Sequence, residues 1–262
     1  MIRAIILAAG HGIRLRPITD ARPKCLVSLH GKTLLDRQAQ VLKGAGVNDI
    51  HVVGGYRVEQ IRMASYNCSV NLQYATTNMV ETLFSALPFI ELDGDLVISY
   101  GDIVYQDDNL KKVLACDDEI CVMIDLNWRR YWELRFEEPL LDAETLIFDN
   151  KGYITELGKK PDSFESIQGQ YTGLIKVRAD KKKEFVKFYK SLDRQKIYEG
   201  KNFSNMYMTS FLQELINSDW KVKGVFVKNG WLEVDSIKDL EIYEKLAKIG
   251  ELASFCQLED VI

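Results

Sequence analysis

The amino-terminal part of the sequence contains the residue types best suited to chemistry. An apolar run at residues 5–7 enters a turn of small residues that includes Gly10 and Gly12. Glycine lets the backbone approach a ligand closely, and a strand that opens into such a loop presents its N–H groups to phosphate oxygens. Arg14 and Lys24 follow and supply the positive charge that a triphosphate needs. The stretch therefore predicts a phosphate-binding loop.

Two common phosphate-binding motifs do not fit this stretch. The dinucleotide fingerprint needs a third glycine, where Leu15 stands, and an acidic residue about 20 positions further on, where residues 27–31 contain none. The Walker A loop is matched only at its end, Gly31-Lys32-Thr33, because Val27 occupies the position of its first glycine. We set both motifs aside, and with them a dinucleotide-dependent oxidoreductase.

Length, composition and charge narrow the class of protein. The 262 residues suffice for one large domain, and the 47% of hydrophobic residues suffice for a sizeable core. The net charge of −4 argues against a general binder of nucleic acid or membrane surfaces, so local cations must meet any anionic ligand. No apolar run approaches the roughly 20 residues of a membrane span, and Arg3 followed by a short strand is not expected to be a signal peptide. We expect a cytoplasmic protein.

The cysteines predict a reducing environment. They are odd in number and show no CxxC spacing, so we expect buried free thiols at Cys25, Cys68, Cys116, Cys121 and Cys256.

The first half of the chain alternates strand-like and helix-like segments around the loop. Strands are expected over residues 49–55, 70–74 and 95–99, and helices after a cap at Thr33 and over residues 58–65 and 79–87. Near-continuous apolar strands that alternate with helices predict a mostly parallel sheet with helices on both faces. Ligands bind beyond the carboxyl ends of such strands. The loop after Leu7 and the Gly101-Asp102 pair after Ser99 are therefore expected to meet at one site.

The second half changes in character and predicts a β-rich insertion. Strands are expected over residues 132–137, 144–148, 153–157, 169–177, 222–227 and 231–235, and helices over residues 180–192 and 204–218. A last helix is expected to begin at Ser236, which forms a capping pattern with Asp239.

The residues of the loop resemble the signature of a known family. Leu-Ala-Ala-Gly-x-Gly-x-Arg-Leu, followed by Pro23-Lys24, is similar to the signature of nucleoside-triphosphate transferases that activate sugar phosphates or small alcohol phosphates. Further matches are Gly31-Lys32, Val53-Gly54-Gly55-Tyr56, Asn78, Gly101-Asp102, Lys160-Pro161, Tyr171-Thr172-Gly173 and residues 231–235. The length of the chain and Asn78-Met79-Val80-Glu81 most resemble the phosphocholine cytidylyltransferase branch. This resemblance implies the Rossmann-like α/β fold of nucleotide-diphospho-sugar transferases.

The sequence shows no internal repeat, low-complexity segment or linker, which favours one domain with an elaborated second half. We expect one nucleotidyltransferase domain over residues 1–262, with a nucleotide-binding half at 1–126, an acceptor-binding half at 127–235, and a C-terminal helix and tail at 236–262. The apolar residues of the tail are expected to pack on the domain or on a partner, and a homodimer is left open.

Members of this family transfer a nucleoside monophosphate to an acceptor phosphate and release pyrophosphate. An acceptor oxygen attacks the α-phosphorus in line, so the charge on both reactants must be neutralised. The resemblance implies Mg²⁺ as the cofactor, held by the carboxylates of Asp102 and Asp235. Glu233 is an alternative ligand because it lies two residues before Asp235, on the same side of a strand.

The remaining roles are carried over from the family position by position. Arg14 is expected to clamp the β- and γ-phosphates and Lys24 to bridge nucleotide and acceptor phosphates, which makes them the catalytic pair. The nucleotide-binding set is Leu7, Ala8, Ala9, Gly10, Gly12, Arg14, Lys24, Asn78 and Gly101. In this set Asn78 would face the base, although it could also cap a helix. Similarity to the branch favours CTP as the nucleotide.

The acceptor is predicted as a small phosphorylated molecule. The acceptor-binding set is Lys160, which matches the lysine that holds the acceptor phosphate, together with Tyr171, Trp231, Glu233, Arg129 and Arg130. Arg129, Arg130 and Arg135, which have acidic residues beside them, suit an acceptor with its own carboxylate, although a salt-bridged surface is an alternative. Their segment resembles cytidylyltransferases of surface-polysaccharide (capsule) pathways, one of which acts on phosphoglutamine. Phosphoglutamine, phosphocholine or a phosphonate is therefore expected, and neither nucleic acid nor membrane is a partner. A sugar-1-phosphate nucleotidyltransferase and a non-catalytic nucleotide-binding regulatory protein remain alternatives.

Overall fold

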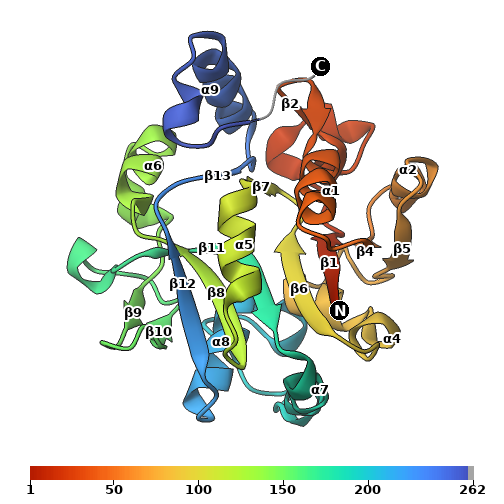
Figure 1. Ribbon diagram of the computed structural model, residues 1–262, viewed down its shortest axis with the longest axis vertical. Coiled ribbons are helices and arrows are strands. Elements are labelled where there is room, and N and C mark those ends of the chain that lie inside the picture. Colours follow the sequence, from red (N-terminus) through yellow and green to blue (C-terminus); the bar gives the residue numbers. More distant parts are fainter. Residues whose placement is uncertain (259–262) are drawn as a thin grey trace.

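A seven-stranded sheet forms the centre of the computed structural model, which describes residues 1–258 (Figure 1). Across the sheet the strands lie in the order β12 (Val222–Val227), β8 (Ile120–Asp125), β11 (Gln170–Val177), β6 (Asp95–Tyr100), β1 (Ile2–Ala8), β4 (Asp49–Gly54) and β5 (Asn67–Val70). Neighbouring strands are parallel except around β11, which runs antiparallel to both β6 and β8. The predicted mostly parallel sheet is confirmed.

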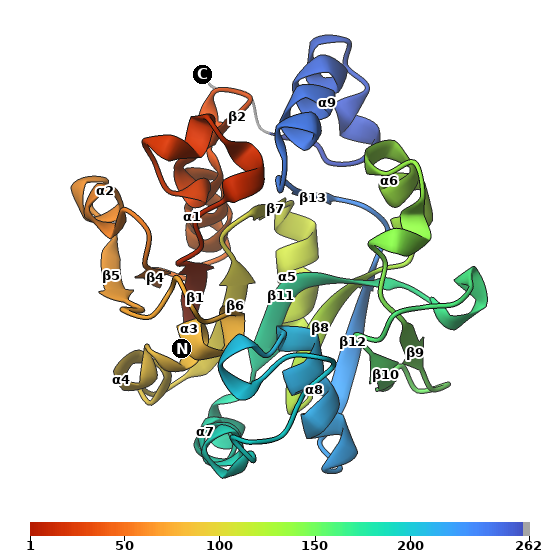
Figure 2. The same ribbon diagram turned by 180° about the vertical axis from the view of Figure 1, so that it is seen from behind.

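The two faces of the sheet contribute to different hydrophobic cores. In β1, Ile6 belongs to one core, whereas its neighbours Ile5 and Leu7 belong to the other, as the side-chain alternation of a strand requires. The first core is covered by α1 (Leu34–Gly44) and α5 (Asp107–Ala115), and the second by α3 (Met79–Phe84), α7 (Lys182–Ser191) and α8 (Met208–Asn217). Figure 1 and Figure 2 show these helical layers from opposite sides.

Within residues 1–258, three short antiparallel pairs of strands lie outside the main sheet. They are β2 (Ser28–Leu29) with β3 (Lys32–Thr33), β9 (Leu146–Phe148) with β10 (Ile154–Leu157), and β7 (Ile103–Tyr105) with β13 (Trp231–Glu233). The β9–β10 hairpin confirms extra β structure in the second half. The β7–β13 pair brings Glu233 beside Ile103, the residue that follows Asp102.

Two helices begin at the capping residues that the sequence predicts. At the start of α1 the hydroxyl of Thr33 accepts a hydrogen bond from the amide of Asp36 at 3.0 Å. At the start of α9 (Ile237–Lys248), Ser236 accepts from the amide of Asp239, and the Asp239 carboxylate accepts from the amide of Ser236. This reciprocal pair is a complete capping box.

The strand expected over residues 132–137 is wrong. These residues belong mostly to α6 (Trp128–Arg135), because Trp128, Tyr131 and Trp132 are buried at positions that share one face of a helix. The alternating apolar residues further along, Leu134 and Phe136, produced the false strand pattern.

Two other predicted elements are shifted or divided. The strand expected over 70–74 ends earlier, at Val70, because the Asn71 side chain forms a turn by accepting a hydrogen bond from the amide of Gln73 at 3.0 Å. The helix expected over 79–87 is divided into α3 and α4 (Leu87–Ile90), and Pro88 lies in the first turn of α4. The helix expected over 58–65 is confirmed as α2 (Val58–Met63).

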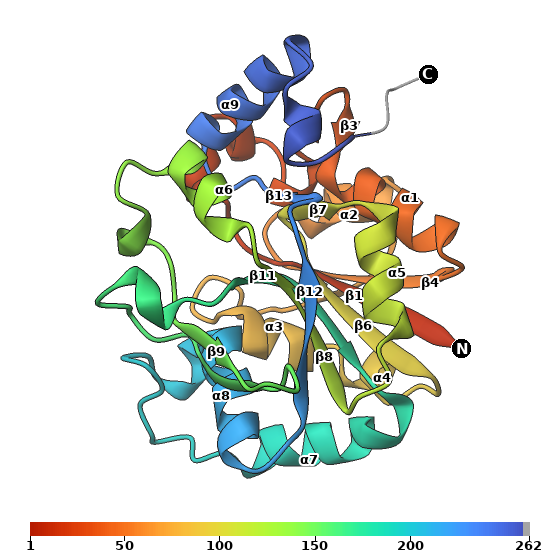
Figure 3. The same cartoon turned by 60° about the vertical axis from the view of Figure 1, so that its left-hand side comes forward.

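Residues 126–169 leave the sheet at the end of β8 and return at the start of β11. Asp125 and Gln170 are paired across these two strands, so the segment begins and ends at neighbouring positions. It contains α6 and the β9–β10 hairpin, which lie to the left of the sheet in Figure 3. Because β11 is antiparallel, it starts at the same edge where β8 ends. The segment therefore projects from the edge predicted to hold the ligand.

The prediction of free thiols is wrong for two of the five cysteines. Cys116 and Cys121 form a disulfide, because the chain turns between the end of α5 and the start of β8 and brings their Cα atoms within 6.3 Å. Cys25, Cys68 and Cys256 are free, and Cys25 and Cys256 are buried.

The C-terminal tail packs on the protein as far as the structure describes it. Leu252, Phe255 and Cys256 are buried in the core that also contains α1 and α5, whereas residues 259–262 of the predicted tail lie outside the described residues. No helix in residues 1–258 has the length and apolar character needed to cross a membrane.

Candidate active site

The loop after β1 and the residues after β6 meet at the carboxyl edge of the sheet, as the sequence predicts. Together with the segment after β13 they enclose a cavity of about 350 Å³. The predicted site residues that line it are Leu7, Ala8, Gly10, Gly12, Arg14, Lys24, Gly101, Asp102 and Asp235. His11 also lines the cavity, and its ring lies 4.8 Å from that of Tyr56, although no site role was predicted for it.

Two glycines allow the close approaches on which this cavity depends. Gly12 has a φ of +62°, and a Cβ atom at this position would lie 3.0 Å from the Cβ of Lys24. A Cβ atom on Gly101 would lie 2.7 Å from the carbonyl oxygen of Leu7. Larger residues would therefore separate the loop from Lys24 and the end of β6 from the end of β1.

Lys24 forms the electrostatic centre of the site. Its Nζ lies 2.7 Å from Oδ2 of Asp102 and 2.6 Å from Oδ1 of Asp235, and the other oxygen of Asp235 forms an ion pair with Arg14. Burial by itself would lower the pKa of Lys24, but the charges of Asp102 and Asp235 raise it above its ordinary value. Lys24 therefore stays protonated and bridges the two carboxylates predicted to hold the metal.

The two carboxylates fit a hard divalent cation. Oδ1 of Asp102 is buried and has no hydrogen-bond partner among the described residues, so one oxygen is available to a cation. Within residues 1–258, no three histidine, cysteine or acidic side chains are arranged to hold a metal. Mg²⁺ suits such a site because it is commonly bound by one or two carboxylates, with substrate phosphates and water as its other ligands.

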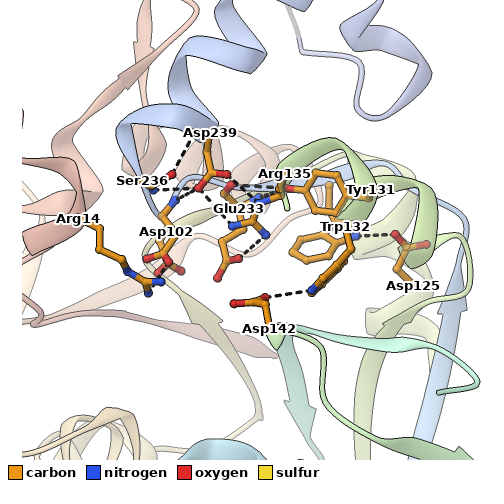
Figure 4. Close-up of polar contacts among 12 residues, drawn as sticks. Arg14, Asp102, Asp125, Tyr131, Trp132, Arg135, Asp142, Glu233, Ser236 and Asp239 are labelled. Atoms are coloured by element: carbon orange, nitrogen blue, oxygen red, sulfur yellow. Dashed lines mark hydrogen bonds and ion pairs between the residues drawn. The ribbon is translucent and has the colours of Figure 1, made fainter. Parts of the chain in front are cut away.

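Glu233 is directed to a different partner. Its Oε2 lies 2.7 Å from Nη1 of Arg135, which is buried on α6 (Figure 4). Burial raises the pKa of Glu233, and Arg135 opposes this rise. Arg135 also binds Asp239. The sequence grouped Arg135 with Arg129 and Arg130 as arginines that suit an acceptor carboxylate, but it did not identify Glu233 and Asp239 as the partners of Arg135. The capping pattern identifies Asp239 only as a helix cap.

Two predicted nucleotide-binding residues do not line the cavity. The carbonyl oxygen of Ala9 accepts a hydrogen bond from the amide of Tyr56 at 3.0 Å. Asn78 caps α3, where its Oδ1 accepts from the amide of Met79 at 2.8 Å, and it lines a neighbouring hollow with Asn205. The capping alternative for Asn78 is therefore confirmed, and its contact with a base stays a prediction.

Trp231 lies in the hydrophobic core and does not line the cavity. It is buried, and its Nε1 donates to Oδ2 of Asp125 at 3.0 Å. Oδ1 of Asp125 accepts from the amides of Asn127 and Asn229, so this buried carboxylate organises the turn before β13. Asp125 is the last residue of β8, and this position at the carboxyl end of a strand is the signal that could have identified it from the sequence.

Arg129 and Arg130, which were predicted to bind the acceptor, do not line the cavity. Arg129 pairs with Glu133 and stacks on the ring of Phe164, whereas Arg130 contacts Ser254 and the ring of Phe255. The predicted alternative, a salt-bridged surface, describes the position of Arg129.

Lys160 and Tyr171 are not among the residues that line the cavity. The ammonium group of Lys160 donates to the carbonyl oxygens of Leu140 and Leu141 at 2.7 and 2.5 Å. The ring of Tyr171 meets that of Tyr100 edge to face, with ring centroids 5.7 Å apart. Their roles in acceptor binding stay predictions.

Glu144 gives the folded protein a pH dependence that can be measured. Burial raises the pKa of its carboxyl from 4.5 to about 7, the charges of Asp142 and Glu233 add to this effect, and Thr209 opposes it. Because the folded state binds the proton more tightly than the unfolded state, ionisation of Glu144 destabilises the protein as the pH rises from 4.5 towards 7. The Glu144→Gln variant should therefore have a higher melting temperature than the natural protein, and this difference should be larger at about pH 8 than at about pH 5.

Thermal unfolding at both pH values measures this difference. The control is Glu133→Gln, which replaces an exposed carboxylate on α6. Its difference in melting temperature from the natural protein should not increase between the two pH values. An effect of Glu144→Gln that is equal at both pH values would contradict the prediction.

A mostly parallel sheet that ends in a glycine-rich loop, with two cations and two carboxylates around one cavity, is an arrangement that suits nucleotidyl transfer. A model of the MobA-like NTP transferase domain matches residues 4–149, which is more than half of the chain. The chain belongs to this family.

Among its relatives, the chain is 44% identical to a CTP:phosphoglutamine cytidylyltransferase of Campylobacter jejuni, over 92% of this chain and 98% of the relative. A choline-phosphate cytidylyltransferase of Streptococcus pneumoniae is 41% identical over 40% of this chain and 47% of the relative. The fold is similar to that of an inositol-1-phosphate CTP transferase from T. maritima, with a TM-score of 0.73, 22% identity and coverage of 95% of this chain and 96% of that one.

Proposed function

We propose that this protein is a cytoplasmic cytidylyltransferase that transfers CMP from CTP to phosphoglutamine, with Mg²⁺ as cofactor, for the modification of a cell-surface polysaccharide. The observation that carries the proposal is the extent of the similarity. The match to the phosphoglutamine enzyme covers 92% of the chain and therefore both halves of the protein, whereas the match to the choline-phosphate enzyme covers 40%. Acceptor choice depends on residues outside the nucleotide loop, so similarity over both halves favours the same acceptor.

The arrangement of charges suits this reaction. An oxygen of the acceptor phosphate forms a bond to the α-phosphorus of CTP, and the bond from that phosphorus to the bridging oxygen of the leaving pyrophosphate breaks. Arg14 and Lys24 would exchange their present carboxylate partners for phosphate oxygens, with Lys24 stabilising the charge that develops in the transition state. Asp102 and Asp235 would hold Mg²⁺, which would neutralise negative charge on the reacting phosphates.

The release of pyrophosphate in the presence of Mg²⁺, measured for each combination of nucleotide and acceptor, tests the proposal. CTP, UTP, GTP, ATP and dTTP are each combined with phosphoglutamine, phosphocholine, 2-aminoethylphosphonate and glucose 1-phosphate. We expect turnover with CTP and phosphoglutamine. Turnover with CTP and another acceptor would correct the acceptor, and turnover with glucose 1-phosphate would favour a sugar nucleotidyltransferase. Binding of CTP without turnover across the whole grid would contradict the proposal.

A further inference from the structure

The segment that carries Asp235 is tied only weakly to the sheet. β13 is a three-residue strand, pairs with β7 alone among the described strands, and ends at Glu233 before Asp235 is reached. One further main-chain hydrogen bond, from the amide of Val234 to the carbonyl oxygen of Asp102 at 2.9 Å, joins the two carboxylate-bearing segments. Side chains must therefore contribute to the placement of Asp235.

Asp239 contacts the backbone of Asp235 directly. Its Oδ2 accepts hydrogen bonds from the amide of Ser236 at 2.9 Å and from the amide of Asp235 at 3.0 Å. The first of these contacts completes the capping box of α9. The second is not required for a helix cap, because Asp235 lies one residue before the capping residue. Asp239 thus fixes the backbone from which the Asp235 carboxylate extends.

Arg135 links this contact to Glu233. Its Nε and Nη2 donate to the two oxygens of Asp239 at 2.9 and 3.3 Å, and its Nη1 lies 2.7 Å from Oε2 of Glu233 (Figure 4). The Arg135 side chain is 1% exposed. A guanidinium group can hold two carboxylates in fixed positions, which an ammonium group cannot do equally well.

Two tyrosines fix the backbone of Glu233 within the same network. The amide of Glu233 donates to the hydroxyl of Tyr131 at 2.7 Å, and the hydroxyl of Tyr243 donates to the carbonyl oxygen of Glu233 at 2.9 Å. The two hydroxyl oxygens are 2.6 Å apart. The start of the segment is therefore held by side chains from α6 and α9, and Asp235 follows two residues later.

We infer that Arg135 and Asp239 are positioning residues that fix the backbone of Asp235 and so keep its carboxylate beside that of Asp102, where the two could bind one divalent cation. The inference rests on the proposed function, because it assumes that these two carboxylates bind the metal. Partners that orient a metal ligand usually affect metal affinity strongly, so the loss of Asp239 should weaken the site while CTP itself still binds.

Binding of Mn²⁺ in the presence of CTP, followed by electron paramagnetic resonance of the free ion, tests this inference. For Asp239→Asn we expect about 10-fold weaker Mn²⁺ binding, and a rise of similar size in the Mg²⁺ concentration for half-maximal turnover. The kcat at saturating Mg²⁺ should change much less. Arg135→Lys keeps the positive charge but loses the planar guanidinium group that contacts two carboxylates. The Mn²⁺ affinity of this variant should therefore lie between that of the natural protein and that of Arg135→Gln.

Ser236→Ala is the matched control. It removes the hydroxyl that caps α9 but keeps the contacts of Asp239 with Arg135 and with the amide of Asp235. It should lower the melting temperature and leave Mn²⁺ affinity unchanged.

Unchanged Mn²⁺ affinity in folded Asp239→Asn, or in folded Arg135→Lys if Asp239→Asn does not fold, would overturn the inference. Mn²⁺ binding is measured without an acceptor, so the choice of the wrong acceptor would leave this result intact. Absence of Mn²⁺ binding to the natural protein with CTP would overturn both the metal site and the inference.

Discussion

Replacing Lys24 with methionine should lower the rate of pyrophosphate release by about 100-fold or more, since the loss of one preorganised charge contact costs that much in comparable sites. The ammonium group lies between Asp102 and Asp235, at the point where nucleotide and acceptor phosphates are expected to meet. Methionine has a similar length and no charge. The initial rate with CTP, Mg²⁺ and the acceptor identified in the grid measures the effect.

The same substitution should have the opposite effect on metal binding without nucleotide. Lys24 pairs with both carboxylates in the structure, so its removal leaves Asp102 without a cationic partner and Asp235 with Arg14 alone, and should strengthen Mn²⁺ binding to the CTP-free protein. Lys111→Met, at an exposed lysine on α5, is the matched control and should change neither rate nor affinity. A near-normal rate for Lys24→Met would remove Lys24 from the catalytic pair.

Asp102→Asn should also lower the rate by about 100-fold or more, because asparagine keeps the shape of the side chain but removes the negative charge that a metal requires. Oδ1 of Asp102 has no hydrogen-bond partner among the described residues, so this oxygen contributes little to the folded protein without a ligand. Turnover and Mn²⁺ binding with CTP should fall together.

The control for this variant lies at the other end of β6. Asp95 pairs there with buried Lys176 and accepts a hydrogen bond from the amide of Ala179. Asp95→Asn should therefore lower thermal stability while the rate stays within a few-fold of the natural value. A folded Asp102→Asn protein with a normal rate and normal Mn²⁺ affinity would rule out Asp102 as a metal ligand.

The features that the sequence predicts well depend on local signals. The glycines at 10 and 12 mark the loop, Thr33 and Ser236 mark helix starts, and apolar runs mark the central strands. The convergence of the loop with Asp102 follows from a general rule for parallel sheets, so it could also be predicted.

Several features that the sequence did not predict depend on contacts between distant residues, whereas others are local elements that the predictions did not cover. Arg135 lies in an aromatic run whose apolar alternation was mistaken for a strand, and only the packing of α6 against α9 brings it to Glu233 and Asp239. No prediction covered α5 or β8, and the pairing of Cys116 with Cys121 depends on the turn between them. Trp231 matched a family position, but its burial beside Asp125 follows from tertiary packing.

Residues 126–169 form an insertion that leaves and rejoins the sheet at one place. Because Asp125 and Gln170 are paired neighbours, a segment of another length or sequence could be joined at the same two positions without changing the register of the sheet. The insertion includes α6, so a donor segment must bring an arginine that matches Asp239 on the recipient. Exchange of this segment between members of the family would then test whether it influences the choice of acceptor, while the nucleotide loop and both carboxylates stay with the recipient.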